Sequence, residues 1–418
     1  MRPVSGGIDF GTSNSTVGVV DGNAPQLLRL EGDSATLPSA LFFNFDDDSV
    51  SVGRHAVAQY TDGVDGRLLR ALKSVLGSSL VHEKTRIKKR NLLFSEIIGL
   101  FIARLKAKLD KHHGQTTEHV VLGRPVQFVD GDPTADRAAQ GELERAARAQ
   151  GFRHVEFQYE PIAAALDYEQ QVSREEVALI VDMGGGTSDF SVVRVSPDGA
   201  RKTDRRDDIL ANEGVHIGGT DFDRLLSIAY IMPALGYLTP TKDGKRNLPA
   251  GYFIDLATWH RIHRLYTSKA LIDLRQIRYE AARPELVDLF IDVVEHRLGH
   301  LLATRVEDAK IALTDTEAAR LHLDLTDARL DIGFTREQLE KTLHGEIARV
   351  SETARQALSA AGIAPADITA VFLTGGSTAI PLARQSLLSL VPQAKVVQGD
   401  AFGSVGIGLA LDAARRFG

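Results

Sequence analysis

Two stretches of the chain repeat one pattern. Residues 8–17 read IDFGTSNSTV, and residues 181–192 read VDMGGGTSDFSV. In each stretch an apolar run ends in an Asp, a turn of Gly and hydroxyl residues follows, and a second apolar run begins, which is typical of two strands joined by a tight turn. Glycines let a turn backbone approach a ligand closely, so that successive N–H groups can point at phosphate oxygens. The sequence therefore predicts two facing turns that hold one polyphosphate between them.

The length and the repeat together predict the domain organisation. A chain of 418 residues exceeds what one hydrophobic core usually serves, and a duplicated hairpin favours two related lobes. The chain turns polar just before the second hairpin, so we expect a first lobe of residues 1–175 completed by a last helix within 398–418. Residues 176–397 would form the second lobe. The predicted fold class is α/β, with two duplicated lobes around a nucleotide cleft.

The composition excludes several classes of protein. Apolar residues make up 43% of the chain and charged residues 25%, as in a soluble globular protein. The net charge of −6 argues against nucleic acid or an anionic membrane as the main partner. There is no cysteine, which excludes disulfides and thiolate metal sites. The N-terminus lacks the pattern of a signal peptide, and we expect a cytoplasmic protein.

Further glycine signals mark two helix starts. Residues 371–378 read VFLTGGST, a strand that enters a Gly-Gly turn, and Pro381 suits the first turn of the next helix. A helix N-terminus with free N–H groups is a ready anion site, here for the α-phosphate and ribose end of a nucleotide. Gly218 and Gly219 form a second such corner. In the last helix, residues 404–415, Gly406 and Gly408 predict close contact with another backbone.

The basic run at residues 84–90 predicts a solvated loop.

Five motifs in this order carry a family resemblance. They are DFGTSNS at 9–15, ALKSVLG at 71–77, EPIAAA at 160–165, DMGGGTSDF at 182–190 and GGSTAIP at 375–381. The set resembles the actin-like ATPase (ribonuclease H-like) fold. Within that fold it is most similar to the DnaK-type seventy-kilodalton heat-shock chaperones, over almost the whole chain. The resemblance implies Mg-ATP bound between the lobes.

The resemblance also assigns roles to individual residues. Asp9 and Asp182 would hold the hydrated Mg²⁺, which keeps several waters and takes carboxylate ligands. Lys73 matches a catalytic lysine, and Glu160 matches the carboxylate that orients or deprotonates the attacking water. Asp182 and Thr187 complete the catalytic group.

The nucleotide would be held by a larger set of residues. The β- and γ-phosphates would lie against the two turns, and the adenosine and ribose against residues from the second lobe and the chain's last segment. The phosphate set is Gly11, Thr12, Ser13, Asn14, Gly184, Gly185, Gly186 and Thr187. The remaining set is Gly218, Gly219, Glu307, Lys310, Thr314, Gly375, Gly376, Ser377 and Asp400.

The sequence departs from the family pattern in three respects. Ile311 and Ala379 occupy positions where the family stacks arginines on adenine, so the base would meet an aliphatic wall with no cation–π contact. Residues 235–290 look like an insertion in the outer part of the second lobe, where a protein partner or exchange factor would bind. The chain also ends at Gly418, as expected for a short, ATPase-domain-only member similar to the bacterial YegD-type proteins.

The leading hypothesis is a slow ATPase whose lobes open and close with the nucleotide state, in a chaperone-like or regulatory role. An alternative is a nucleotide-dependent binding switch or a filament-forming actin-like protein in which hydrolysis is incidental. A sugar kinase or exopolyphosphatase on the same fold would need an acceptor-site base, and the sequence offers no candidate for one. The client, the exchange factor and the oligomeric state do not follow from the sequence.

Overall fold

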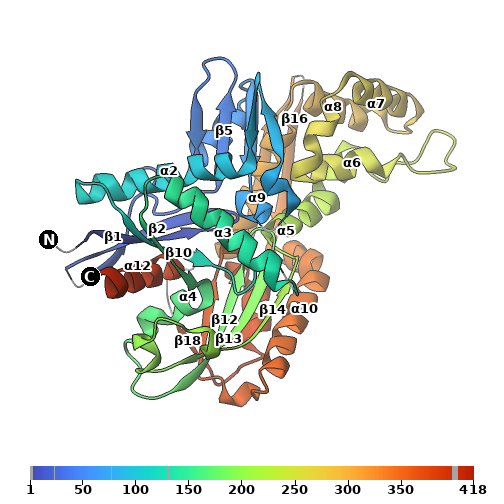
Figure 1. Ribbon diagram of the computed structural model, residues 1–418. Helices are drawn as coiled ribbons and strands as arrows, with labels where there is room; N and C mark the ends of the chain where they lie inside the picture. The colour runs from blue at the N-terminus through green and yellow to red at the C-terminus, as the bar shows by residue number, and fades with distance from the viewer. Residues whose placement is uncertain (1–2, 23, 77, 130, 327, 398–402) are drawn as a thin grey trace.

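The computed structural model describes residues 3–22, 24–76, 78–129, 131–326, 328–397 and 403–418. Within these ranges the architecture rests on two mixed sheets flanked by helices (Figure 1). The first sheet has the strand order β11-β10-β1-β2-β3, with β4 paired to β2. Its strands are β1 (Ser5–Phe10), β2 (Asn14–Asp21), β3 (Ala24–Leu27), β4 (Leu37–Pro38), β10 (His119–Arg124) and β11 (His154–Tyr159).

The second sheet repeats the topology of the first. Its order is β14-β13-β12-β17-β18, and its strands are β12 (Glu176–Met183), β13 (Ser188–Val195), β14 (Ile209–Val215), β17 (Ala370–Thr374) and β18 (Lys395–Val397). In both sheets an antiparallel hairpin is extended on one side by an antiparallel strand and on the other by two parallel strands. The repeated hairpin in the sequence thus corresponds to a repeated sheet.

Helices cover the outer faces of both sheets. The first sheet carries α2 (Phe94–His113) and α3 (Pro133–Ala149), and they bury Phe101, Leu105 and Leu143 against the strands. The second sheet is covered by α10 (Arg336–Ala360), which α11 (Pro381–Leu388) and α5 (Gly219–Leu226) contact, while α9 (Gly299–Asp315) packs on β15 and on α5. Pro133 and Pro381 each stand at the first position of a helix, as expected from their fixed φ.

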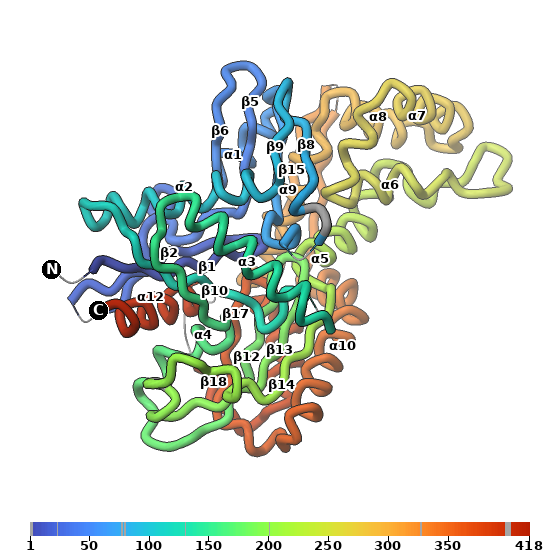
Figure 2. The backbone as a smooth tube through the Cα atoms, viewed as in Figure 1, coloured from blue at the N-terminus to red at the C-terminus, as the bar shows by residue number. Residues whose placement is uncertain are grey.

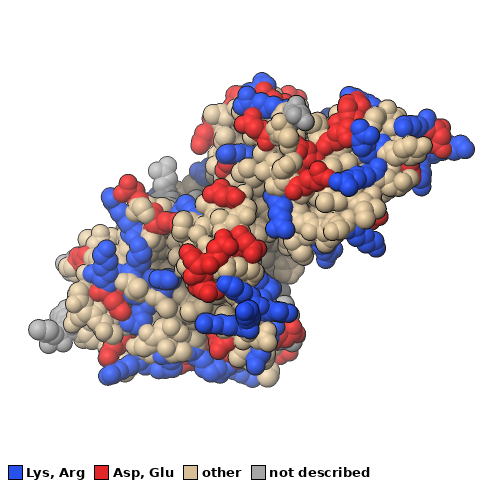
Figure 3. Space-filling model, turned by 90° about the horizontal axis from the view of Figure 1, so that it is seen from above, with Lys and Arg blue, Asp and Glu red and all other residues tan. Residues whose placement is uncertain are grey.

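Smaller elements extend the body outward (Figure 2). On the first side they are β5 (Ala40–Asn44), β6 (Val50–Val52), α1 (Gly53–Thr61), β7 (Gly66–Arg70), β8 (Lys84–Ile87) and β9 (Arg90–Leu93). On the second side they are α6 (Ala250–Ala257), α7 (Ser268–Glu280), α8 (Pro284–Glu295), β15 (Ala318–Asp324) and β16 (Arg329–Thr335). Helices α6 to α8 form an arm that projects from the body. Basic and acidic side chains are interspersed over the face seen from above (Figure 3).

The prediction of a solvated loop at residues 84–90 is wrong, because β8 and β9 form an antiparallel hairpin there. Lys84 and Arg86 are exposed while Thr85 and Ile87 are buried, so the basic side chains occupy one face of a strand. An alternation with period two is the signal of a half-buried strand, and the charges obscured it.

Two helices are packed between the sheets. α12 (Ser404–Phe417) lies on the first sheet, where a Cβ on Gly18 would come within 2.4 Å of the Gly406 carbonyl oxygen. α4 (Glu160–Glu169) packs on α12 and on the second sheet, in a core shared by Ile162, Ile180 and Val193. The two helices thus form a layer between the sheets, in which α12 lies on the first sheet and α4 lies on the second.

Close approach of the two helices depends on glycine. A Cβ on Gly408 of α12 would lie 1.8 Å from the carbonyl oxygen of Ala163 in α4. Backbone atoms cannot move aside as a flexible side chain would, so a side chain at this position must push the helices apart. The expectation that Gly406 and Gly408 permit close backbone contact is confirmed.

A second contact joins the outer parts of the two halves. The Tyr60 ring of α1 lies 4.6 Å from the ring of His300 in α9, and the Trp259 ring lies 4.9 Å from the same imidazole. The Arg70 guanidinium, at the end of β7, lies 4.6 Å from the Trp259 ring centre. Burial lowers the pKa of His300 to about 4, so the imidazole is neutral at physiological pH.

Within the described ranges, every helix is too short or too polar to cross a bilayer.

The α4–α12 contact yields a stability prediction. Gly408→Ala should lower the free energy of unfolding by about 2 kcal/mol or more, because the added methyl group clashes with backbone. The control is Gly345→Ala in α10, where no described atom lies within 4 Å of the added Cβ. That change should stabilise the protein by about 0.5–1 kcal/mol through helix propensity. Urea denaturation measures both, and equal effects of the two substitutions would contradict the packing argument.

Candidate functional site

The two glycine-rich turns face each other. A Cβ on Gly185 in the second turn would lie 2.2 Å from Ser13 Oγ in the first. Such an approach is possible because Gly185 has no side chain. Asn14 and Thr187 border the same turns, and a Cβ on Gly186 would meet no described atom within 4 Å. The turns therefore present backbone N–H groups to a shared space.

A glycine corner supports the second turn from behind. The Gly219 amide donates to the Gly184 carbonyl at 3.0 Å, and the Thr220 amide donates to the Gly185 carbonyl at 2.8 Å. Gly218 lies so close to the turn that a Cβ would come within 2.6 Å of Gly185 C. The start of α5 thus fixes the Gly184 and Gly185 carbonyl groups, while the Gly184 amide donates within the turn to the Thr187 carbonyl at 2.9 Å.

Lys73 and Glu160 form a buried ion pair. Lys73 lies on a single 3-10 turn, Leu72–Val75, that follows β7, and Glu160 is the first residue of α4. The ammonium group donates to Glu160 Oε1. The side chains are 10% and 15% exposed, so the pair is largely shielded from water. Residues 87 positions apart are thereby brought together at the edge of the cleft.

Asp9 and Asp182 lie near this pair and feel its charges. Desolvation raises the pKa of Asp9 to about 8, and the negative charges of Glu160 and Asp182 act in the same direction. The positive charge of Lys73 lowers this pKa in part. Desolvation and the neighbouring Asp189 and Glu160 charges raise the pKa of Asp182 to about 7. For Lys73, the carboxylates outweigh desolvation and raise the pKa of its ammonium group above the ordinary value. The site thus gathers the carboxyl groups of Asp9, Asp182 and Glu160 around one ammonium group.

This donor set fits a hydrated magnesium ion. Mg²⁺ takes one or two carboxylates together with waters and phosphate oxygens, and a divalent charge would offset the excess of carboxylates. Among the described residues no group of three or more His, Asp or Glu side chains is arranged to hold a metal by itself. Asp9 and Asp182 are thus suited to a cation that arrives with a phosphate ligand.

The third glycine turn closes another side of the site. Gly375 has φ +78°, and a Cβ there would lie 2.8 Å from Asp182 Oδ1. The Ser377 hydroxyl donates to the Gly184 carbonyl at 3.2 Å, from the short turn Gly376–Ala379. Gly375, Gly376 and Ser377 therefore lie beside the second glycine turn.

Residues of α9 reach the site to different extents. Lys310 Nζ lies 2.9 Å from Asp223 Oδ1 and donates to the Gly219 carbonyl at 3.2 Å, so it braces the glycine corner. Glu307 and Asp308 precede it on the same helix. Thr314, one turn further, donates to the Ile311 carbonyl and is not in contact with the glycine turns in the described structure. Asp400 lies outside the described residues.

Two acidic residues of the site were missed by the sequence analysis. Asp189 stands directly opposite Asp182 across the β12–β13 hairpin, as Thr16 stands opposite Asp9 across β1–β2. The symmetric spacing about each turn could have identified it, since antiparallel register pairs such positions. Asp223 was quoted within a motif but given no role, and its pairing with Lys310 depends on tertiary structure.

A cavity of about 570 Å³ adjoins these carboxylates. Glu160, Asp182, Thr187 and Asp189 line it on one side, and the Pro125–Gln127 segment, Asn212–His216 and Arg349 line the rest. Glu160, Asp182 and Thr187, which the sequence analysis assigns to hydrolysis, are thus accessible from this cavity as well as from the glycine turns.

The twin sheets, the facing turns and the paired lysine and glutamate can now be compared with known families. A family model described as Hsp70 protein matches residues 5–236 and 284–415. The chain belongs to the Hsp70 family. The resemblance derived from the five motifs is confirmed at the family level, and so is the actin-like ATPase fold. The Hsp70 match omits residues 237–283, which include α6, α7 and Trp259.

Membership of the Hsp70 family has a direct functional meaning. Hsp70 proteins are nucleotide-binding, chaperone-type ATPases, and the matched segments contain all three glycine turns together with Lys73 and Glu160. The chain is therefore a nucleotide-binding member of a chaperone ATPase family.

The raised carboxyl pKa values predict a pH dependence of stability. Both groups bind protons in the folded protein at pH values where the unfolded chain has lost them, so stability should fall as pH rises from about 4 towards 8. Asp182→Asn removes one ionisable group and should raise Tm more at pH 8 than at pH 5, because each unit by which a pKa is raised corresponds to about 1.4 kcal/mol of free energy.

The measurement is thermal unfolding in EDTA without nucleotide. Asp315→Asn, at the exposed end of α9, serves as the control and should show no such growth of its effect with pH. An Asp182→Asn effect that is the same at pH 5 and pH 8 would show that burial of this charge does not govern stability.

Proposed function

We propose that the protein binds Mg-ATP between the two glycine turns and hydrolyses it slowly. The observation that carries the proposal is the buried Lys73–Glu160 pair beside the facing turns and next to Asp9 and Asp182. Phosphoryl transfer requires amide groups and cations around the phosphate oxygens and a carboxylate near the attacking water. The Hsp70 match supports nucleotide binding independently of this geometry.

Each residue then has a defined task. The turns at residues 11–14 and 184–187 bind the β- and γ-phosphates through their backbone amide groups, apart from the Gly184 amide, which donates to the Thr187 carbonyl. Lys73 neutralises charge that develops on the γ-phosphate oxygens, and Glu160 orients the attacking water and accepts its proton. Thr187, on the cavity side, orients the same water. Mg²⁺, held through Asp9 and Asp182, would supply further positive charge to the phosphates.

Nucleotide binding would be coupled to movement of the two lobes, residues 1–175 with 398–418 and residues 176–397. The packing of α4 supports this proposal, because α4 belongs to the first lobe and lies directly on the second sheet, with Ile162 in one core with Ile180 and Val193. Small sliding of packed helices is a common means of domain closure. Such closure would serve a chaperone-like or regulatory role, in keeping with the family.

A protein partner or exchange factor would bind at the projecting arm. Leu238, Ile272 and Tyr279 lie in this region and are 58%, 64% and 70% exposed. Exposed apolar side chains of this size favour a protein contact.

The hydrolysis proposal predicts a strong effect of Lys73. Lys73→Ala should lower single-turnover ATP hydrolysis by about 10²–10³-fold, because a preorganised charge at the transferred phosphate is lost. The dissociation constant for ATP, measured by calorimetry with Mg²⁺, should change much less. Lys111→Ala, at the exposed end of α2, is the control. Equal hydrolysis by wild type and Lys73→Ala would remove Lys73 from the mechanism, and absence of ATP binding to wild type would end the proposal.

The aliphatic wall predicts weak discrimination between bases. Ile311 is 55% exposed, one residue beyond Lys310 on α9. Wild type should therefore bind ATP and GTP with similar affinity. Ile311→Arg should tighten ATP binding by about two- to fivefold, because a guanidinium group can stack on the adenine. Ile272→Arg, an equally exposed isoleucine on the arm, should leave the affinity unchanged. A marked preference of wild type for ATP over GTP would contradict this base-pocket interpretation.

A further inference from the structure

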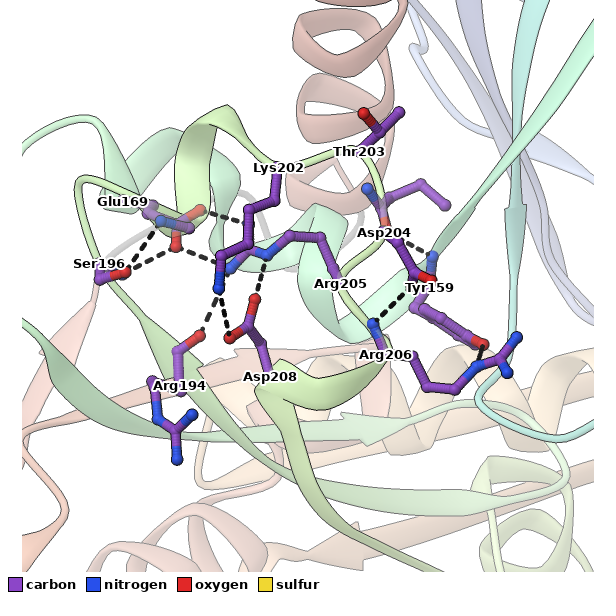
Figure 4. Close-up of polar contacts among 12 residues, drawn as sticks. Tyr159, Glu169, Arg194, Ser196, Lys202, Thr203, Asp204, Arg205, Arg206 and Asp208 are labelled. Atoms are coloured by element: carbon purple, nitrogen blue, oxygen red, sulfur yellow. Dashed lines mark hydrogen bonds and ion pairs between the residues drawn. The ribbon is translucent and has the colours of Figure 1, made fainter.

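The loop between β13 and β14, residues 196–208, reaches both ends of helix α4. Figure 4 shows the polar contacts of this loop. Arg205 and Arg206 are adjacent in the sequence, yet one extends to the C-terminal end of the helix and the other to its N-terminal end. The helix has 10 residues and is about 15 Å long. A single loop therefore spans its whole length.

The C-terminal end of α4 is held by a buried ion cluster. The Arg205 guanidinium donates to both oxygens of Glu169, at 2.7 and 2.8 Å, and through Nε to Asp208 at 2.6 Å. The three side chains are at most 4% exposed. Glu169 also accepts the Ser196 amide at 2.8 Å. The planar guanidinium thus fixes the direction as well as the distance of the carboxylate.

Breaking this ion cluster would destabilise the folded protein. Glu169 is the last residue of α4, where a negative charge is unfavourable because the helix C-terminus is itself negative. A buried carboxylate that loses its partner is strongly destabilised. The end of the helix therefore stays with the loop whenever the loop is in place.

The N-terminal end of α4 is held more lightly. Arg206 Nε donates to the hydroxyl of Tyr159 at 3.2 Å. Tyr159 is the residue immediately before Glu160 and caps the helix. The Arg124 guanidinium lies 5.1 Å from the centre of the same ring, so Tyr159 is held between two arginines.

The last helix is joined to the same loop. Arg415 Nη1 donates to the Lys202 carbonyl at 2.7 Å, and Arg416 Nη2 donates to the Thr203 carbonyl at 3.1 Å. Both arginines also contact Asp412 of their own helix. The loop thus connects the second sheet to α4 and to α12 at once.

The packing of α4 explains why polar ends are needed. Its central residues Ala163, Ala164 and Ala165 present methyl groups, and α12 opposes them with Gly408. Shallow ridges allow close approach but resist sliding along the helix axis weakly. Polar groups at the ends of the helix therefore add a constraint on its axial position that the small residues alone supply weakly.

We propose that residues 202–208 form a clasp that fixes the axial position of α4 and so sets the position of Glu160 against Lys73. Arg205 and Arg206 are positioning residues, because they contact the helix and not the reacting groups. The catalytic consequence rests on the proposed ATPase function, whereas the effect on the helix does not. Lys73 belongs to a different segment, after β7, so a shift of α4 changes the separation of the pair.

The test uses Arg205→Lys in the full chain, which keeps the charge but loses the fork that binds Glu169 and Asp208. Once its fold is established by circular dichroism, this variant should hydrolyse ATP roughly tenfold more slowly in single turnover, with its Kd for ATP unchanged. Tyr159→Phe, which removes the acceptor of Arg206, should have a smaller effect in the same direction. Arg201→Gln, at an exposed position of the same loop, is the matched control and should behave as wild type.

A double-mutant cycle distinguishes positioning from general destabilisation. In a Glu160→Gln background, Arg205→Lys should have little further effect on hydrolysis, because the clasp acts through Glu160. The proposal would be overturned if Arg205→Lys lowered the hydrolysis rate by the same factor in both backgrounds. It would also be overturned if Arg205→Lys and Tyr159→Phe left the hydrolysis rate unchanged.

Hydrogen exchange provides a readout that needs no nucleotide. Arg205→Lys should speed amide exchange across residues 160–169 relative to wild type and to Arg201→Gln. Unchanged exchange would show that the loop does not fix α4. If wild type binds ATP without hydrolysing it, the ATPase function fails, while faster exchange in α4 would still support the clasp.

Discussion

The packing of α4 on α12 is the contact on which the rest of the structure depends. Each helix lies on one of the two sheets, and the helices approach each other through small residues, so they form a closely packed layer between the sheets. The clearest case is the Ala163 carbonyl, which occupies the space that a side chain on Gly408 would need. Because Glu160 begins α4, this layer also positions the carboxylate that pairs with Lys73.

Electrostatics at the site follow from this arrangement. The two turns converge on one space, and each contributes a carboxylate at the end of its first strand. Burial and mutual repulsion keep Asp9 and Asp182 partly protonated near neutral pH, and Lys73 offsets this charge incompletely. A site of this kind is suited to a ligand that brings its own cation.

Much of this could be predicted from the sequence because local signals and family motifs agreed. The repeated hairpin predicted two related sheets, and the glycines of the last helix predicted a close backbone contact. The hairpin at residues 84–93 was missed because its charged residues masked an alternating pattern. Asp189 was overlooked although the register of its hairpin pointed to it. The clasp at Arg205 could not be predicted, since the residues that it joins are brought together by the crossing of α4 between sheets.

The sole tryptophan of the chain lies where the outer parts of the two halves touch. Trp259 comes from the segment that the family match omits, while the guanidinium over its ring comes from β7 on the opposite side. An indole that loses such a neighbour to water changes its emission. The protein therefore carries an intrinsic optical reporter of this contact between the outer parts, read at one residue and requiring no attached dye.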